Sequence, residues 1–565
     1  MARKEMTMDI FRGFALAGLI VTLVVLVVSV WRTHKGSDSS FAKLSSIGKF
    51  IDKYWIVFLL LTFAVFLISR VVKLDSLPNG IHIDEIAVQV DAKSILLNGT
   101  DRWGYRYPAY FYDLGNGQNA LYTYVEAFLL MFLPPTIFTL RIQAVIWGAL
   151  CFFAMFGICY EITGNKGYAL MGPVLVTTLP IFMMSERWAL EAYLFLPTAI
   201  ITLYFFIVAV RTGKIRYWII SGICMGTSLY TYAVSYMTWP IFLVLTGIYL
   251  LYLKKINIRQ ILGFGIPLGI LAFPLIVFQL VNFHVIEPMR LWISDYVPLY
   301  EQRGREFALS NIMENLSYVK YLFLGGDDLT YNAVPEFGTI YMFLIPFVVI
   351  GLFICIKDTV TSIREKQFSI SPLVVFFWIG GTAFMLVVKN PNVNRLNMLF
   401  MPFTLFIVIA VYRLLHKDEL AFSWMTVWTG ASFAFFMYFY FFLQTPMYGY
   451  HLLFSDTTPA KALFRTESAY LRNEDTHIYI QCEDHVPQRN AQIFYYAAKP
   501  GDVFDFDRGE YGNVTAALPQ EFDLNENAVY IIGNDWGHII SYLISEGFAA
   551  DQSFPGYSIL INPNI

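Results

Sequence analysis

The sequence predicts a polytopic α-helical membrane protein with a small α/β domain at its C-terminal end. The first observation is composition: 57% of the residues are hydrophobic and 14% are charged, whereas about a quarter of a soluble domain is charged. The second is the set of long apolar stretches, because roughly 20 apolar residues cross a bilayer and we identify about twelve such stretches. The third is a change near residue 444, after which acidic residues outnumber basic ones.

The predicted membrane spans extend from near the N-terminus to residue 443. We expect them near residues 11–31, 55–73, 141–160, 167–184, 192–210, 217–235, 236–253, 260–281, 339–356, 371–388, 397–413 and 421–443. The first stretch lacks a small-residue cleavage site, so it is expected to remain as a span. The stretch 120–133 is also apolar, but it is short and contains Glu126. It is predicted to be a juxtamembrane helix at the membrane surface.

Basic residues in short loops predict the orientation, because such residues gather on the cytoplasmic side. They crowd four loops that fall on one side of the membrane when the spans are counted, near residues 211–216, 254–259, 357–366 and 413–417. The opposite side then receives the N-terminus, the loops 74–140 and 282–338, and everything after about residue 444. We therefore expect a multi-pass protein of the cell membrane, with its large loops and its C-terminal domain extracytoplasmic.

Three regions follow from this pattern. Residues 1–54 form an additional N-terminal span and a cytoplasmic loop, residues 55–443 form the transmembrane domain, and residues 444–565 form an extracytoplasmic soluble domain. In the last region, apolar runs at 478–480, 529–532 and 557–561 predict strands, and 458–471 and 537–547 predict helices. Cys482 is the only thiol of this region, so the domain must be held by its own core rather than by an internal disulfide.

The loop 74–140 carries two adjacent carboxylates, Asp84 and Glu85. They precede a predicted helix over 86–97, which Asn98-Gly99 would end. Near a helix N-terminus the macrodipole stabilises negative charge. Asp84 could therefore simply cap the helix, and Glu85 could pair with a nearby arginine. A carboxylate just outside the bilayer could also act as a general base.

An ordered set of motifs accompanies this pair over residues 50–415. The set comprises D-A-K-S-I-L-L-N-G (91–99), D-R-W-G (101–104), Arg141 opening a span, S-E-R-W-A-L-E (185–191), Gly222, Gly226 and Tyr230-Thr231-Tyr232 with Pro240, Gly325-Gly326-Asp327 with Asn332, Pro335 and Gly338, and Arg395 before a span with Pro402. In order and membrane side, this set resembles the GT-C superfamily of glycosyltransferases. The resemblance is greatest to the branch of the protein O-mannosyltransferases and the lipid A aminoarabinose transferases.

The resemblance implies a GT-C fold and transfer of a sugar from a polyprenyl-phosphate donor to an acceptor hydroxyl of a glycan, lipid or protein, with inversion. It implies that Asp84 is the general base, that Glu85 accompanies it, and that Glu191 is a second acid that orients the acceptor or holds a metal. A salt bridge from Glu191 to Arg187, one helical turn away, is the structural alternative.

The departing phosphate needs positive charge. Arg395 is the first candidate, because a guanidinium can bind two phosphate oxygens; snorkelling at the membrane interface is its alternative role. Further candidates are Arg187, Arg303 and Arg305, and in the loop 282–338 also Arg290 and Lys320.

No cofactor is predicted with certainty. Where several relatives carry Lys or His, this chain has Gly117-Gln118-Asn119-Ala120. His82 and His284 each lack a second histidine at ligand spacing, so a divalent metal stays an open alternative without assigned ligands. The net charge of −3 comes without a basic stripe, which argues against nucleic acid as a partner. Besides membrane lipids, the expected partners are the lipid-linked sugar and its acceptor.

A transporter or a flippase for lipid-linked sugars is the rival function. Such proteins usually place ionisable residues in the middle of the membrane and often consist of two related halves. The predicted spans carry essentially no ionisable residue away from their ends, and no matching halves are evident. These observations favour an enzyme whose chemistry takes place at one face of the membrane.

Overall fold

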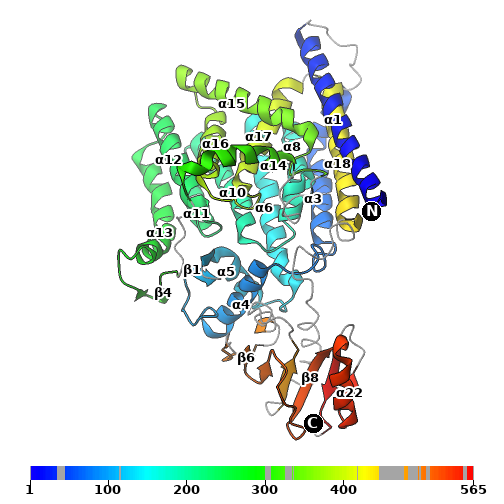
Figure 1. Ribbon diagram of the computed structural model, residues 1–565. Helices are drawn as coiled ribbons and strands as arrows, with labels where there is room; N and C mark the ends of the chain where they lie inside the picture. The colour runs from blue at the N-terminus through cyan, green and yellow to red at the C-terminus, as the bar shows by residue number, and fades with distance from the viewer. Residues whose placement is uncertain are drawn as a thin grey trace.

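A computed structural model describes residues 2–34, 45–113, 116–299, 307–324, 334, 336–415, 418–443, 476–481, 494–495, 498–503, 505, 509–551 and 557–563. A bundle of long helices forms one end of the molecule, and a sheet domain forms the other (Figure 1). Two shorter helices, α4 (Ile83–Asn98) and α5 (Ala120–Leu129), lie between them. The arrangement is that of a polytopic membrane protein with a separate C-terminal domain.

Every predicted span corresponds to a helix or a broken helix. The bundle consists of α1 (Ala2–His34), α3 (Trp55–Val71), α6 (Ile137–Thr163), α8 (Met171–Thr178) with α9 (Pro180–Ser185), α10 (Glu191–Thr212), α11 (Ile215–Ser228), α12 (Ser235–Tyr252), α13 (Ile258–Asn282), α15 (Ile345–Glu365), α16 (Ser371–Val387), α17 (Phe400–Leu415) and α18 (Glu419–Tyr438). Among the described residues, eight helices are long and apolar enough to cross a membrane, and α3 and α16 are apolar but shorter.

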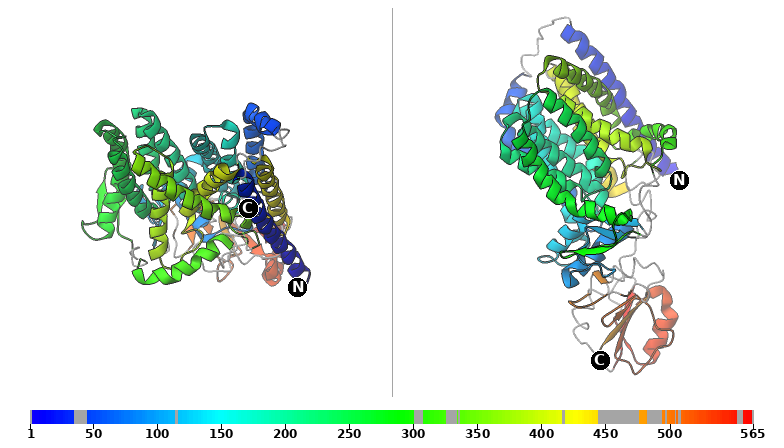
Figure 2. Two further views of the ribbon diagram at one scale, coloured as in Figure 1. Left: turned by 90° about the horizontal axis from the view of Figure 1, so that it is seen from above. Right: turned by 90° about the vertical axis from the view of Figure 1, so that its left-hand side faces the viewer.

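The remaining two predicted spans are interrupted or short for local reasons. The helix after α7 (Lys166–Ala169) breaks at Leu179, whose extended backbone precedes Pro180 at the first position of α9, because a residue before proline is disfavoured in helical geometry. The helix α11 ends at Ser228, and turns lead from it into α12. At the edge of the bundle (Figure 2), α1 packs on α18, where Phe14 stacks on Trp428 with ring centroids 4.5 Å apart.

The loop 74–140 folds into α4, a hairpin and α5. The strands β1 (Tyr110–Asp113) and β2 (Asn116–Asn119) pair antiparallel, and β2 runs directly into α5. The left-handed conformation of Gly99 (φ 70°) ends α4, as the Asn-Gly pair predicted. The stretch 120–133, predicted to be a helix, forms α5 over its first ten residues.

The C-terminal domain contains a six-stranded sheet of order β6-β7-β5-β8-β10-β9. Its strands are β5 (His477–Ile480), β6 (Glu510–Tyr511), β7 (Val514–Thr515), β8 (Ala528–Gly533), β9 (Ala549–Asp551) and β10 (Tyr557–Ile561). The central strand β5 is parallel to β7 and β8, whereas β10 is antiparallel to β8. The helix α22 (Gly537–Ser545) packs on one face. The three predicted strands and the last helix are confirmed, and the predicted helix 458–471 lies outside the described residues.

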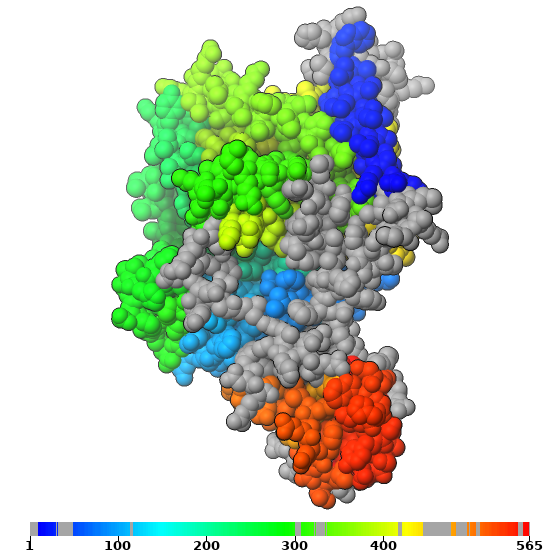
Figure 3. Space-filling view, in the orientation of Figure 1, coloured from blue at the N-terminus to red at the C-terminus, as the bar shows by residue number. Residues whose placement is uncertain are grey.

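The sheet domain protrudes beyond the rest of the molecule (Figure 3), and two polar contacts between described residues join it to the loop. The Tyr495 hydroxyl donates to Glu126 Oε1 on α5 at 2.8 Å. The side chain of Asn98, the last residue of α4, donates to the Asp502 carbonyl at 2.7 Å. The C-terminal domain therefore contacts both helices of the loop.

Candidate active site

The first turn of α4 is capped by His82 rather than by Asp84. The His82 Nδ1 atom accepts the amide hydrogen of Asp84 at 3.1 Å, and the Glu85 carboxylate accepts the amide hydrogen of His82 at 2.9 Å. The capping role considered for Asp84 is therefore wrong. The Asp84 side chain is 40% exposed, and its Oδ2 lies 3.6 Å from His82 Nδ1.

Glu85 lies in a different environment, fully buried behind the first turn. Its two carboxylate oxygens accept from Arg141 Nε (2.8 Å) and Nη2 (2.9 Å), and Oε1 also accepts the Ala189 amide. Burial opposes ionisation, but the Arg141 charge and these hydrogen bonds outweigh it and hold the pKa of Glu85 below its usual value. Glu85 is thus the ion-pair partner that the sequence offered as its alternative role. Its expected part in catalysis is corrected, because both oxygens are already engaged inside the fold.

Glu191 is the first residue of α10 and is buried. The backbone amide of Asn119, at the end of β2, donates to its carboxylate, and Asn119 Nδ2 lies 3.5 Å from Oε1. The Tyr236 hydroxyl of α12 donates in turn to Asn119 Oδ1 at 3.0 Å. The negative charge of Glu191 therefore lies at a helix N-terminus, where the macrodipole stabilises it.

The hairpin β1–β2 brings Asp84 and Glu191 into one neighbourhood. Gln118 Nε2 donates to the Asp84 carbonyl at 3.3 Å, and the next residue, Asn119, binds Glu191. The sequence reasoning noted these two residues only as a departure from the relatives. Their role becomes visible only when β2 is folded against α4 and α10.

Arg187 does not pair with Glu191. Its guanidinium instead donates to carbonyl oxygens at and just beyond the end of α3, those of Ser69, Arg70, Val72, Lys73 and Leu77, at 2.7–3.2 Å. It also lies over the rings of Tyr440 and Phe441. The expected ion pair with Glu191 is therefore wrong, and the assignment of Arg187 to the donor phosphate is corrected because these carbonyls occupy its Nη hydrogens.

Arg395 lies in the segment that enters α17. Its Nη1 donates to the Lys389 carbonyl at 2.6 Å, and its side chain is partly exposed. Two residues further on, the Asn397 side chain donates to the carbonyl of Ala192. This contact holds the segment against the first turn of α10, next to Glu191.

The structure gives less support to the other residues predicted to bind the donor phosphate. Arg303 and Arg305 lie outside the described residues, as do most of the Gly-Gly-Asp motif and its Asn-x-x-Pro continuation. Arg290 pairs with Asp295 in a hairpin at Nε–Oδ1 2.5 Å. Lys320 is exposed on α14 (Ile312–Leu324).

A second acidic cluster lies deeper in the loop, around Arg102. Asp91 and Asp113 each accept from Arg102 Nη2 at 3.0 Å, and Asp101 accepts the amides of Trp103 and Tyr105 at 2.9 Å. Burial, reinforced by the charge of Asp91, raises the pKa of Asp101 to about 7. Burial also raises the pKa of Asp91 to about 6, against the effect of Arg102. This cluster fastens the segment after Gly99 to α4.

The side chains that could hold a metal ion bear on what the site can bind. Among the described residues, no group of three or more His, Cys, Asp or Glu side chains is arranged to hold a metal ion.

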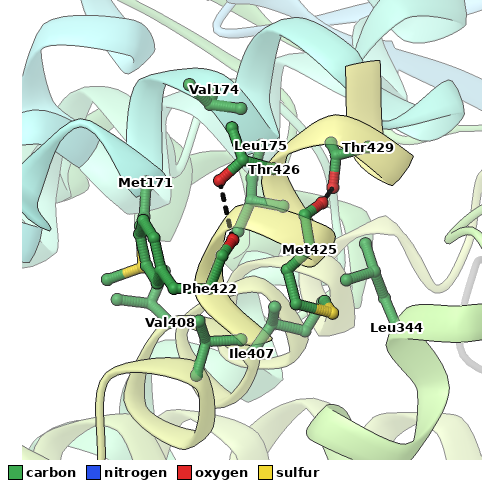
Figure 4. Close-up of a pocket in the computed structure, with 11 residues that line it drawn as sticks. Met171, Val174, Leu175, Leu344, Ile407, Val408, Phe422, Met425, Thr426 and Thr429 are labelled. Carbon is green, nitrogen blue, oxygen red and sulfur yellow. Dashed lines mark hydrogen bonds between the residues drawn. The ribbon is translucent and has the colours of Figure 1, made fainter. Parts of the chain in front are cut away.

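A cavity of about 50 Å³ lies within the bundle, where Val174 and Leu175 of α8 face α17 and α18 (Figure 4). Its threonine hydroxyls donate to carbonyls of their own helix, Thr426 to Phe422 at 3.0 Å and Thr429 to Met425 at 2.7 Å. This cavity is apolar and takes no part in the polar site.

Comparison with known proteins identifies the architecture. No family model and no curated protein matches the chain. Crystal structures of ArnT from Cupriavidus metallidurans, one bound to undecaprenyl phosphate and one in the apo state, match with a TM-score of 0.52 at 12% identity, over 90% of this chain and 98% of that chain. The chain has the GT-C fold. An oligosaccharyltransferase from Archaeoglobus fulgidus, tethered with an acceptor peptide, matches at 11% identity over 91% of this chain and 74% of that chain, with a TM-score of 0.48.

Proposed function

We propose that this protein is an integral-membrane glycosyltransferase that moves a sugar from a polyprenyl-phosphate carrier to an acceptor hydroxyl. The observation that carries the proposal is the partly exposed carboxylate of Asp84, whose backbone carbonyl is contacted by the same short hairpin that binds the buried carboxylate of Glu191. The donor class is supported by the shared fold with an enzyme whose structure holds undecaprenyl phosphate.

In the proposed reaction, Asp84 accepts the proton of the acceptor hydroxyl while that oxygen attacks the anomeric carbon. The bond between the anomeric carbon and the phosphate oxygen breaks, and its electron pair leaves with the polyprenyl phosphate. Attack from the face opposite the leaving group inverts the anomeric centre. A positioned carboxylate contributes roughly 10²–10⁴-fold to such a step.

Glu191 and Arg395 take supporting roles in this proposal. Glu191 accepts a hydrogen bond from the acceptor and so orients it, while the Asn119 amide holds the carboxylate in place at the N-terminus of α10. Arg395 provides positive charge to the phosphate, since Asn397 holds its segment against the first turn of α10. A guanidinium is suited to this role because it is permanently charged and can bind two oxygens.

The active site is proposed to lie on the extracytoplasmic side. The helix α10 begins at Glu191, beside the hairpin, so Arg211 near its other end and the adjacent Lys214 mark the opposite face of the bundle. Basic residues gather on the cytoplasmic side. In a cysteine-free background, an impermeant maleimide should label Ile544→Cys in intact cells and Lys214→Cys only after permeabilisation. The reverse pattern would invert the proposed orientation.

Transfer of radiolabelled sugar from a panel of polyprenyl-phosphate donors, by the purified protein in acceptor-containing membranes, tests the function. With the donor that supports transfer, Asp84→Asn should lower the rate at least about a hundredfold, because an amide cannot accept the proton. His82 caps α4, so both Asp84→Asn and Asp84→Ala should fold normally. Asp75→Asn, at an exposed aspartate of the same loop, is the matched control.

Two outcomes would contradict the proposal. Near-wild-type transfer by Asp84→Asn would remove the general base from this position. Movement of intact lipid-linked sugar across the bilayer, with no transfer from any donor, would instead support the flippase.

A further inference from the structure

A short hairpin next to α13 presents its most apolar residues at its tip. The strands β3 (Met289–Leu291) and β4 (Ser294–Tyr296) pair so that Leu291 faces Ser294, which leaves Trp292 and Ile293 as a two-residue turn. Trp292 is 77% exposed and Ile293 is 66% exposed. Two large apolar side chains at an exposed turn require an explanation, because turns in water favour small and polar residues.

The backbone of this turn does not explain the residues. The backbone of Trp292 has φ +55°, which lies in the left-handed region. Residues other than Gly, Asn and Asp rarely adopt this conformation. Two-residue hairpin turns favour Gly and Asn for this reason. The chain therefore keeps a tryptophan where the local geometry disfavours it.

The position of the hairpin tip beside the lipid-facing surface of α13 does explain Trp292 and Ile293. The Trp292 ring lies against Phe273, with centroids 6.0 Å apart. Phe273 precedes the end of α13, at Asn282, by nine residues (282 minus 273), which is roughly 13 Å along a helix. The outward residues of α13 around it, Ile266, Ile270 and Ile276, are exposed, as is typical of a lipid-facing span. The tip thus folds back from the end of α13 to the level of its lipid-facing surface.

The base of the hairpin is joined to the loop that carries Asp84. Asp295 pairs with Arg290 across the hairpin, so these two charges neutralise each other. The Asp295 amide also donates to the Arg106 carbonyl at 2.9 Å, and the Asp295 carboxylate accepts the Arg106 amide at 3.0 Å. In Figure 1 the hairpin lies at the lower left, between α13 and the loop.

We infer that the hairpin tip, Trp292 and Ile293, inserts into the lipid leaflet on the loop side of the membrane and anchors the loop 74–140 through Asp295 and Arg106. Tryptophan is enriched at membrane interfaces because its ring is apolar while its N–H remains hydrogen-bonded. Insertion removes two exposed apolar side chains from water, which is the compensation for a disfavoured turn. The inference does not depend on the sugar-transfer activity.

Site-directed spin labelling in liposomes tests the insertion. In a cysteine-free background, a nitroxide is placed at Ile293→Cys and its collision rates with oxygen and with a water-soluble nickel chelate are compared. Ile270→Cys on α13 is the lipid control, and Ile544→Cys on α22 is the aqueous control; all three variants replace exposed isoleucines. Position 293 should resemble 270, with oxygen dominating by several-fold. Dominance of the nickel chelate, as at 544, would overturn the inference.

A second variant separates anchoring from turn formation. Trp292→Asn places a turn-favouring residue at φ +55° and removes the ring. With the label at 293, its exposure to the nickel chelate should rise at least twofold, while thermal stability in detergent is unchanged or higher. An unchanged exposure in this variant would show that Trp292 does not hold the tip in lipid, and would overturn the inference.

Discussion

Asp84 and Glu85 are adjacent in the chain, yet they belong to two regions of the loop 74–140 that differ in exposure. At the rim, the Asp84 side chain is 40% exposed, its Oδ2 lies 3.6 Å from His82 Nδ1, and Gln118 Nε2 donates to its backbone carbonyl. In the interior, Glu85 is fully buried and receives hydrogen bonds from Arg141 and from two backbone amides. The comparison teaches that the burial of a carboxylate, rather than its place in a motif, decides whether it holds the fold or can meet a substrate.

The same contrast recurs along α4. Successive residues of a helix point about 100° apart, so one step along the chain moves a side chain from the rim to the interior. Asp91, seven residues after Asp84, lies on nearly the same face of α4 as Asp84, yet it is buried and shares Arg102 with Asp113. The rim and the interior therefore make separate predictions, one set in activity and the other in stability.

The largest expected effect is in the interior. Glu85→Ala should lower the free energy of unfolding by about 3–5 kcal/mol, because Arg141 is left as a buried charge without its partner. Thermal unfolding in detergent measures the loss. The double variant Glu85→Ala, Arg141→Met should recover part of it. Asp84→Ala is the matched control at the rim and should unfold as the wild type does; equal stability of Glu85→Ala would erase the distinction between the regions.

Glu191 is buried but lies beside the hairpin that contacts Asp84, so Glu191→Gln should keep the fold and lower transfer by roughly tenfold to a hundredfold. Glutamine keeps a carbonyl oxygen for the Asn119 amide but loses the charge. The kcat and KM for the acceptor should be measured separately, because an orienting residue should raise KM as well as lower kcat. Glu161→Gln, on the far end of α6 and paired with Arg211, is the control. Unchanged kcat and KM would mean that Glu191 holds the fold and does not orient the acceptor.

The Arg102 cluster should give the interior a pH dependence. The pKa of Asp101 is about 7 in the fold and near 3.9 when unfolded, so the folded protein binds the proton more tightly. Stability should therefore be greatest below about pH 4 and fall as the pH rises toward 7. Asp101→Asn should remove much of this dependence of stability on pH. It should also stabilise the protein at pH 8 by roughly 2 kcal/mol, because each unit of pKa displacement is worth about 1.4 kcal/mol. The gain is smaller than the full displacement of Asp101 would give, because the pKa of Asp91 is raised as well. Asp75→Asn is the control and should keep the pH dependence; an equal dependence in Asp101→Asn would contradict this assignment.

The smallest effect is expected where the C-terminal domain meets the loop. Burial raises the pKa of Glu126 to about 8, and the hydroxyl of Tyr495 opposes this shift. Tyr495→Phe should raise the pKa of Glu126 further and cost about 1 kcal/mol. Hydrogen exchange should increase in peptides covering α5 and residues 498–503. Tyr542→Phe, on the outer face of α22, should change neither; equal protection in both variants would mean that this contact does not join the domains.

The sequence predicted the membrane spans, the juxtamembrane helix and three strands of the sheet because each leaves a local apolar pattern. It misplaced the cap of α4, because aspartate is the commoner cap and only the folded turn shows the His82 nitrogen accepting the Asp84 amide. Helical spacing offered a salt bridge from Glu191 to Arg187 as one alternative, whereas the actual acceptors of Arg187 lie more than 100 residues earlier. The link from Asn119 to Glu191 spans 72 residues, so no local pattern contains it.

The contacts of Arg187 have a consequence for how the chain is made. The last carbonyls of α3 have no partner within their own helix, and groups of this kind are costly in or near lipid. Their donor is encoded 118 residues after Ser69, which is roughly 6–24 s of synthesis at ordinary rates. During that interval the end of α3 must rely on water or on the insertion machinery. The second span therefore reaches its final state only when the fifth begins to enter the membrane, and a ribosome stalled between them would hold an unfinished helix end.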